Sequence, residues 1–343
     1  MTVIAVDVMS GERGALECIR GALLAAAAEP DLRLLLVGDP AAIDPELARL
    51  QVATSLRARI DTVAAHEIVH MTDSPREAIR RKKNSSMRIA VDLVHEGRAS
   101  GVVSAGNTGA LTAIAHFVLK CLPGIERAPI MSAIPNARGV THMLDLGANT
   151  RATPPQLAQF AVMGRIVARD VHGIAAPRVG LLNIGVEETK GHELVQEAHL
   201  MLRALANDAD PERRIDYLGF VEGHDIFTGE VDVVVTDGFT GNVALKTMEG
   251  VAALIGARLR AEFHASLPSR LAGLAARPVL RRVSDTLDPR RYNGAVMVGL
   301  GGVVVKSHGS ADQVSLARAI AIAATAVRGG LVAHVGQALG SAP

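Results

Sequence analysis

The chain has 343 residues, which is enough for one large α/β unit or two smaller domains with a sizeable core. Hydrophobic residues make up 49% of it but aromatic residues only 2%, so the core must be built mainly from alanine, valine, leucine and isoleucine. Its 36 Lys and Arg residues nearly balance 35 Asp and Glu residues, and the net charge of +1 excludes the globally basic surface typical of nucleic-acid-binding proteins.

Three further features bear on the cellular compartment. The N-terminal stretch MTVIAVDVMSGERG has no basic lead and reaches Asp7 after a few apolar residues, so we do not expect it to be a secretion signal. The alanine-rich stretch at 319–327 is too short to span a bilayer. Cys18 and Cys121 lie outside any C-x-x-C motif, which argues against a disulfide framework or a zinc site. We therefore expect a soluble, cytoplasmic protein without a bound metal.

Short β-branched or leucine-rich runs recur along the chain and predict β-strands. They lie at 3–6, 32–37, 101–103, 143–146, 179–183, 231–236 and 303–305. Segments rich in alanine, leucine, arginine and glutamate separate most of them and are typical of helices. This alternation predicts an α/β fold with a largely parallel sheet between helices.

Six polar, glycine-containing loops follow these runs. They lie at 7–12, 104–109, 145–149, 183–191, 236–242 and 306–312. In open α/β sheets, ligands bind beyond the carboxyl ends of the strands. If the strands are parallel, we expect these loops to converge on one ligand site.

One pattern, Val-Val-(Ser/Thr)-x-Gly-x-Thr-Gly, occurs twice: VVSAGNTG at 102–109 and VVTDGFTG at 234–241. It is typical of a strand that leads into a helix N-terminus, where unpaired N–H groups and the helix dipole favour an anion. We call 104–109 the first twin loop and 236–242 the second twin loop. The alternative is that the glycines only make turns. The residues expected to hold phosphate or an oxyanion are Gly106, Asn107, Thr108, Gly109, Gly238, Thr240, Gly241 and Asn242.

Other strand-end residues are candidates for the same site. Lys306 and His308 flank Ser307, and we expect both to contact an anion. Lys190 is either a phosphate cation or the ion-pair partner of Glu187 or Glu188. Three further residues have a structural alternative beside the functional one. Asp237 either orients a cation or water or caps a helix, Asp7 is a ligand or a hydrogen-bond acceptor, and Asn149 is a ligand or a turn residue.

The segment 250–291 has no credible strand and carries a local excess of five positive charges. Leu267, Leu271 and Leu274 share one helix face, and Pro268 and Pro278 are expected to break the helix. The pattern predicts two or three amphipathic helices that protrude from a single α/β catalytic domain spanning 1–343. The leucines suit either a membrane surface or a dimer interface.

Seven sequence blocks together resemble the PlsX family of phosphate acyltransferases, in the same order over nearly the whole chain. They are IAVDVMSGE, REAIRRKKNSSMRIA, VVSAGNTGALTA, MLDLGAN, RVGLLNIGVEETKG, TDGFTGNVALKTMEG and GVVVKSHGSAD. The resemblance implies transfer of a fatty acyl group from acyl carrier protein to inorganic phosphate, which gives an acyl phosphate for phospholipid synthesis. It implies a three-layer α/β/α fold akin to phosphate acetyltransferases and isopropylmalate dehydrogenases.

The resemblance also implies partners. A homodimer is expected, peripherally associated with the inner face of the membrane, and its product would pass to a membrane glycerol-phosphate acyltransferase. Acyl carrier proteins are acidic, so a basic run is a candidate contact surface, although such runs are often only solvated. The run comprises Arg80, Arg81, Lys82 and Lys83, with Arg88 nearby. No nucleic acid and no cofactor are expected.

Four positions depart from the family pattern. Related N-termini usually read D-x-M-G-G-D-x-G, but Ser10 replaces a glycine and Glu12 the shorter aspartate. After the 145–149 turn, Arg151 stands where an acid is expected and Thr153 stands before the proline. The changes at Ser10, Arg13, Arg151 and Thr153 leave two alternatives open: a weakened enzyme, and a membrane-associated scaffold of lipid enzymes that has lost its activity.

The chemistry needs positioning more than acid–base groups. Phosphate is largely dianionic near neutral pH, and a thiol leaves without a strong acid. Holding the reactants together and stabilising the oxyanion supply most of the rate.

Two other enzymes remain alternatives. A nicotinamide-dependent dehydrogenase is disfavoured because neither twin loop matches G-x-G-x-x-G. A short-chain phosphotransacylase would accept acyl coenzyme A instead of an acylated carrier protein. The acyl donor therefore separates this second alternative from the main prediction.

Overall fold

The computed structural model describes residues 1–286 and 288–340. Within them, eleven strands form one sheet in the order β3-β2-β1-β4-β11-β10-β5-β6-β9-β7-β8. The strands are β1 (Thr2–Asp7), β2 (Leu32–Gly38), β3 (Ile60–Ala64), β4 (Gly101–Ser104), β5 (Ile130–Asn136), β6 (Gly139–Leu144), β7 (Arg178–Leu182), β8 (Asp216–Val221), β9 (Val233–Val235), β10 (Ala295–Met297) and β11 (Val303–Lys306).

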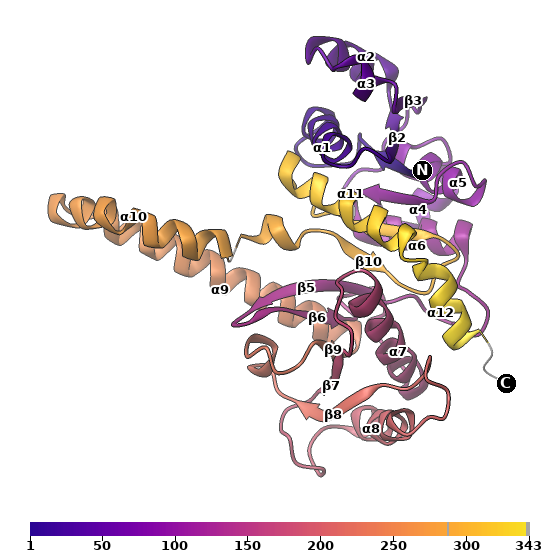
Figure 1. The fold of residues 1–343 in the computed structure, drawn as a ribbon, viewed down its shortest axis with the longest axis vertical. Helices are drawn as coiled ribbons and strands as arrows, with labels where there is room; N and C mark the ends of the chain where they lie inside the picture. Colours follow the sequence, from indigo (N-terminus) through magenta and orange to yellow (C-terminus); the bar gives the residue numbers. More distant parts are fainter. Residues whose placement is uncertain (287, 341–343) are drawn as a thin grey trace.

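Helices cover both faces of the sheet (Figure 1). One face carries α1 (Ala15–Ala28), α2 (Pro40–Arg49), α7 (Pro154–Asp170), α8 (Glu193–Ala206), α11 (Gln313–Arg328) and α12 (Leu331–Leu339). The other carries α4 (Pro75–Arg81), α5 (Ser86–His95), α6 (Thr108–Leu119) and part of α9 (Gly238–His264). The remaining helices are the short α3 (Thr54–Arg57), α10 (Leu267–Thr286) and the 3₁₀ turns η1 (Asp225–Phe227) and η2 (Pro289–Tyr292).

The core has the composition that the sequence requires. Two apolar layers, one on each face, consist almost wholly of valine, leucine, isoleucine and alanine. Phe160 on α7 is the largest fully buried side chain. The predicted three-layer α/β/α fold with a largely parallel sheet is therefore confirmed.

The sheet consists of two parallel halves that run in opposite directions. The first half is β3, β2, β1, β4 and β11, and the second is β6, β9, β7 and β8. Strands β10 and β5 join them through antiparallel pairs. The strand-end loops therefore do not leave a single edge of one parallel sheet.

The strand register nevertheless brings both sets of carboxyl ends to one level. A single row of paired residues crosses all eleven strands, and each strand of either half ends at this row or within two residues beyond it. The first half reaches the row from one direction and the second half from the other. The row is Thr62, Leu36, Val6, Val103, Val305, Val296, Met131, Leu144, Val235, Leu181 and Phe220.

Helices α9 and α10 lie side by side and extend away from the sheet (Figure 1). Helix α9 begins at Gly238, inside the second twin loop, rather than near residue 250. No residue of α10 is buried, and Leu267, Leu271 and Leu274 are 74%, 69% and 64% exposed. Residue 287 of the predicted segment lies outside the described residues.

The prediction that two prolines break this segment is wrong. Pro268 occupies the first turn of α10, where a missing N–H costs nothing, and Pro278 lies inside α10 without ending it. The break between the two helices falls instead at 265–266. Phe263 of α9 packs where a side chain at Gly273 would stand, at 2.8 Å from the Cβ position, so the hairpin requires glycine there.

Across the described ranges no single helix is both long and apolar enough to cross a membrane. Helices α11 and α12 meet that test by length and composition only as a pair, bent by 55°.

Candidate functional site

Three polar residues end neighbouring strands of the first half and lie side by side. Asp7, Ser104 and Lys306 are paired in register at the ends of β1, β4 and β11, and all three are buried. The Ser104 hydroxyl donates to Asp7 Oδ2 at 2.7 Å and accepts the Gly106 N–H at 3.1 Å. Asp7 is thus the strand-end hydrogen-bond acceptor that the sequence offered as one alternative.

Lys306 is a buried cation. It is 8% exposed, and burial lowers the pKa of its ammonium to about 8, although Asp7 and Glu12 act to raise it. Its Nζ donates to the carbonyl oxygen of Ser307. The positive charge of Lys246, on α9, also acts to lower this pKa. Among residues 1–286 and 288–340, no carboxylate lies within ion-pair distance of Lys306, so a bound anion would gain from it.

The side chain of Asn107 is fully used within the fold. Its Oδ1 caps α6 by accepting the Ala110 N–H at 3.0 Å, and its Nδ2 donates to the carbonyls of Met71 and Asp73 at 2.9 and 3.0 Å. The amide therefore ties the turn before α4 to the first twin loop. The expectation that Asn107 holds phosphate therefore stays a prediction for its backbone N–H, because its side-chain amide is engaged within the fold.

The backbone of the first twin loop remains free to bind. In the part of the chain that the structure describes, no acceptor lies within hydrogen-bonding distance of the N–H groups of Asn107, Thr108 and Gly109. Thr108 and Gly109 are exposed. A Cβ on Gly106 would stand 2.4 Å from Met87 Cε and 2.6 Å from Ser10 Cβ, so both side chains would have to shift to admit it. Free N–H groups at a helix N-terminus are an arrangement that favours an anion, so this loop stays a candidate for phosphate.

The second half gathers its polar groups around Asp145. Its carboxylate accepts the N–H groups of Ile130, Gly147, Ala148 and Asn149 and the Asn149 side-chain amide, at 2.6–3.2 Å. Burial raises the pKa of Asp145, and these hydrogen bonds oppose that rise. Asn149 Nδ2 also donates to Ala128 O at 3.2 Å, so Asn149 is a turn residue that braces the loop.

In the second twin loop, the N–H groups at the start of α9 are already hydrogen-bonded to a residue of the loop itself. Asp237 caps α9 by accepting the Phe239 and Thr240 N–H groups at 3.0 Å, and its other oxygen accepts the Thr240 hydroxyl at 2.6 Å. Gly238 N–H donates to Asn149 O at 2.9 Å. A Cβ on Gly241 would stand 1.9 Å from Asp145 O. The expectation that this loop cradles an anion stays a prediction, but the Asp237 carboxylate already accepts the N–H groups that an anion would use.

The two twin loops are also far apart along the sheet. Their strands, β4 and β9, are separated by five strand spacings, or about 24 Å on a flat sheet. Asn242 is exposed and packs against Gly147, at 3.4 Å from a Cβ built there.

Lys190 and His308 are exposed loop residues. Lys190 forms neither of the ion pairs offered by the sequence, because in the described ranges no carboxylate lies within ion-pair distance of it, and Glu188 instead approaches Arg203 at 3.4 Å. Its backbone is held by Asn183 Nδ2, which donates to the Lys190 carbonyl at 3.1 Å. The His308 ring lies 2.9 Å from the hydroxyl of Ser310.

Sequence reasoning missed Asn293. Its Nδ2 donates to Ser307 Oγ at 2.8 Å and to Ser315 O at 2.7 Å, and its Oδ1 accepts the His308 N–H at 2.9 Å. It therefore fixes the loop that follows Lys306. Nothing in the local pattern marks it, because it precedes a strand of three residues.

The basic run before α5 is partly used within the fold. Lys82 bridges the Asp73 carboxylate at 2.5 Å and the Ile68 carbonyl at 2.7 Å, and its hydrogen bond lowers the pKa of Asp73. The expectation that Lys82 contacts a partner stays a prediction, but its ammonium is already paired within the fold. Arg80, Arg81 and Lys83 remain exposed beside the turn that Asn107 holds.

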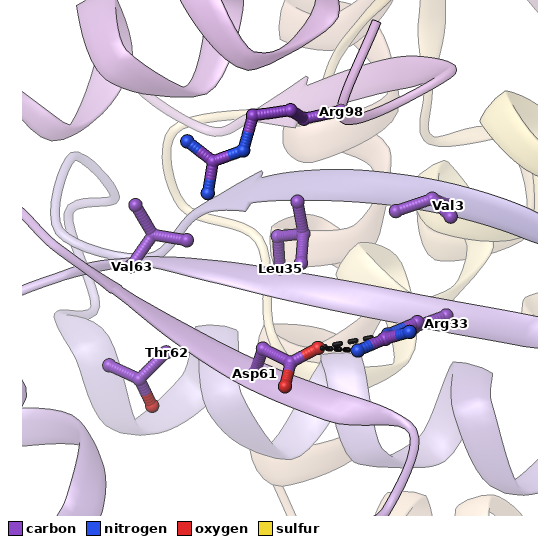
Figure 2. Close-up of a pocket in the computed structure, with 7 residues that line it drawn as sticks. All are labelled: Val3, Arg33, Leu35, Asp61, Thr62, Val63 and Arg98. Carbon is purple, nitrogen blue, oxygen red and sulfur yellow. Dashed lines mark hydrogen bonds and ion pairs between the residues drawn. The ribbon is translucent and has the colours of Figure 1, made fainter.

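A surface hollow of about 440 Å³ lies elsewhere, on the sheet near its β3 edge (Figure 2). Val3, Leu35 and Val63 form its apolar floor, and the Arg33–Asp61 ion pair and Arg98 lie around it. Strand-end loops do not line it. In the described ranges, no cluster of three or more His, Cys, Asp or Glu side chains is placed to hold a metal ion.

Comparisons with known proteins bear on both the fold and the family. The family model for "Fatty acid synthesis protein" matches residues 2–334. The chain is 49% identical over 337 residues to the phosphate acyltransferase of Methylococcus capsulatus, covering 98% of this chain and 96% of that one. It is 48% identical over 343 residues to that of Polaromonas naphthalenivorans, covering 100% and 91%.

Solved structures share the fold at low identity. The phosphotransacetylase EutD from Staphylococcus aureus matches with a TM-score of 0.63 at 17% identity, covering 95% of this chain and 94% of that one. A 4-hydroxythreonine-4-phosphate dehydrogenase from Klebsiella pneumoniae matches with a TM-score of 0.52 at 13% identity, covering 98% and 100%. One fold thus serves two chemistries, and the sequence relatives distinguish between them. The chain belongs to the fatty acid synthesis protein family, as a phosphate acyltransferase of the PlsX type.

Proposed function

We propose that this phosphate acyltransferase takes a fatty acyl group from acyl carrier protein and transfers it to inorganic phosphate held at the first twin loop. The observation that carries the location is a group of hydrogen-bond donors and a buried cation without anionic partners at the strand ends of the first half. Within the described ranges, the N–H groups of Asn107, Thr108 and Gly109 make no hydrogen bond. Lys306, which pairs in register with Ser104 at the start of this loop, has no carboxylate partner there. We further propose that 1–343 acts as one catalytic domain, with 250–291 as its helical extension.

The reaction follows from that arrangement. A phosphate oxygen attacks the thioester carbonyl carbon, so that a C–O bond forms and the carbonyl oxygen becomes an oxyanion. The oxyanion collapses, the C–S bond breaks, and the carrier leaves as a thiolate that takes a proton from water. The chain's own residues hold the dianion beside the carbonyl and neutralise charge, which are the two contributions this reaction needs. At pH 7 a pKa of about 8 keeps most of Lys306 protonated.

The carrier protein is expected to dock beside the first twin loop. Pro75, the first residue of α4, packs against that loop at 3.2 Å from a Cβ built on Gly109. Arg80 and Arg81 at the end of α4, and Lys83 after it, are exposed. An acidic partner held by these side chains would place its acyl thioester near the free N–H groups, and its association would weaken with salt.

The exposed leucines of α10 favour a second contact, with an anionic membrane surface. Burying each leucine contributes about 1.5–3 kcal/mol, and each nearby arginine adds about 1 kcal/mol at an anionic leaflet. This suits reversible attachment at the inner face of the membrane, where the downstream glycerol-phosphate acyltransferase would use the product. The homodimer implied by the resemblance would cover the same leucines instead.

Release of carrier thiol from a long-chain acyl carrier protein tests the reaction. We expect thiol release to require inorganic phosphate and to yield one acyl phosphate per thiol. Equal release without phosphate would mean thioester hydrolysis. A clear preference for short-chain acyl coenzyme A would favour a short-chain phosphotransacylase.

Leu271→Glu tests the membrane contact, with Ala272→Glu as the matched control on the same helix. Both add one negative charge, but only the first removes a leucine. We expect Leu271→Glu to lower binding to anionic vesicles at least tenfold, and Ala272→Glu to lower it much less. Unchanged vesicle sedimentation together with loss of a dimer in solution would favour the dimer interface.

A further inference from the structure

Ser10 carries a polar group that the fold leaves without a partner. It lies in the loop after β1, is 5% exposed, and its hydroxyl makes no hydrogen bond to any residue of the described ranges. Buried hydroxyl groups in native proteins are almost always paired, so each exception calls for a physical explanation.

The position of Ser10 is well defined by its neighbours. Its Cβ and Oγ stand 2.6 and 3.3 Å from the place that a Cβ on Gly106 would occupy, so Ser10 packs directly on the first twin loop. Glu12 N–H donates to the Gly309 carbonyl at 2.9 Å. The segment 10–12 therefore lies between the loop that starts α6 and the loop that follows Lys306.

Most of the polar groups around Ser10 are hydrogen-bond donors, and one of them is a cation. The free N–H groups of the first twin loop and the Lys306 ammonium would all favour an anion. Two carboxylates lie nearby. Asp7 is already engaged with Ser104 and with the Met9 N–H, at 2.7 and 3.3 Å. Glu12 lies against Gly309, where its Oε1 is 2.5 Å from a Cβ built there.

We propose that the Ser10 hydroxyl donates a hydrogen bond to the phosphate substrate, and so is a further phosphate-binding residue of this enzyme. The inference rests on the proposed location of phosphate at the first twin loop. A serine hydroxyl is a suitable donor because its proton rotates to meet the ligand, and a hydrogen bond to a charged oxygen is stronger than one to a neutral partner. Bound phosphate thereby satisfies the one orphaned hydroxyl of this cluster.

Ser10→Ala tests this proposal, because it removes only the hydroxyl. We expect KM for phosphate to rise about tenfold, which corresponds to ~1.4 kcal/mol. The kcat is expected to stay within about twofold, and KM for the acyl carrier protein to stay unchanged. Ser86→Ala is the matched control, because Ser86 on α5 also has a fully buried, unpartnered hydroxyl but lies outside the strand-end loops. We expect it to leave KM for phosphate within about twofold.

A binding measurement without acyl donor provides the second readout. Inorganic phosphate should raise the melting temperature of the wild-type protein, and Ser10→Ala should need about tenfold more phosphate for the same rise. An unchanged phosphate response in both assays would overturn the proposal and leave Ser10 as a merely hydrated group. A fall in kcat at constant phosphate KM would also overturn it, because the hydroxyl would then act on the oxyanion.

Lys306→Gln separates failure of this inference from failure of the site. If Lys306→Gln weakens phosphate binding and Ser10→Ala does not, the site stands and the role of Ser10 is wrong. If neither variant changes the phosphate response, phosphate binds elsewhere, and the inference fails together with the proposed location.

Discussion

The two twin loops share a sequence pattern but start their helices differently. In the first, the cap is Asn107, the residue after the first glycine, and it is neutral. In the second, the cap is Asp237, the residue before that glycine, and it is charged. This two-residue shift decides which N–H groups at the helix start are hydrogen-bonded to the cap. The same pattern therefore leaves free N–H groups in the first loop, whereas in the second loop the capping carboxylate accepts them.

The difference extends to the surroundings of each loop. Around the first loop, in the described ranges, a buried lysine lacks a carboxylate partner and a buried serine hydroxyl lacks any partner. Around the second, Asp145 accepts four hydrogen bonds from its own turn and a fifth from the Ile130 N–H. A cluster that is already saturated rigidifies the fold, and one with spare donors is ready for a ligand. We infer that the first half of the sheet binds phosphate and that the second half braces the molecule.

Gly241→Ala should have the largest effect, and on stability. The new Cβ would stand 1.9 Å from the backbone oxygen of Asp145, which cannot yield without moving the turn. We expect a loss of about 3 kcal/mol in the free energy of unfolding, measured by urea denaturation.

Gly106→Ala is the matched substitution in the first loop, where the three nearest atoms belong to the side chains of Met87 and Ser10 rather than to the backbone. It should cost about 1 kcal/mol in stability and lower phosphate affinity more than Gly241→Ala does. A reversed order of the two stability losses would contradict the division into a binding half and a bracing half.

Much of this arrangement is visible in the sequence. The seven predicted runs all contain strand residues, because buried parallel strands are continuous apolar runs. The missed strands lack such runs. β3 and β8 lie at the sheet edges and mix polar with apolar residues, β10 has three residues, and β5 contains Pro135.

The sequence does not show that the strands of the two halves of the sheet run in opposite directions. It also does not show which strand-end residues this arrangement brings together. Direction follows from the pairing of β5 with β10, residues more than 150 positions apart in the chain, which no local pattern encodes. Ser10 stands out in the sequence as a departure from the family pattern, but only the fold brings its hydroxyl against Gly106. The role of Asp237 is the exception, because an aspartate before a helix already favours a cap.

Lys306→Gln should have the next largest effect, and on catalysis. Loss of the buried cation at the end of β11 should lower kcat/KM for phosphate about 100-fold with little change in stability. The wild-type enzyme should also lose kcat/KM as pH rises through about 8, because Lys306 becomes neutral there and attracts the dianion less. This alkaline limb should disappear in Lys306→Gln, and its persistence would assign the titration to another group.

The smallest effects are expected from substitution of the two helix caps. These two substitutions compare the twin loops most directly. Asp237→Ala and Asn107→Ala each remove a cap, so each should lower the free energy of unfolding by about 1 kcal/mol. Asn107→Ala also releases the turn at Met71 and Asp73, so it should raise KM for the acyl carrier protein a few-fold.

Asp237→Ala should change KM for phosphate by less than about threefold, since it removes a carboxylate that lies far from the bound anion. Steady-state kinetics with both substrates varied distinguishes the two caps. If Asp237→Ala instead tightens phosphate binding strongly, the start of α9 is an anion site that its own aspartate masks. The second loop would then share the chemistry assigned to the first.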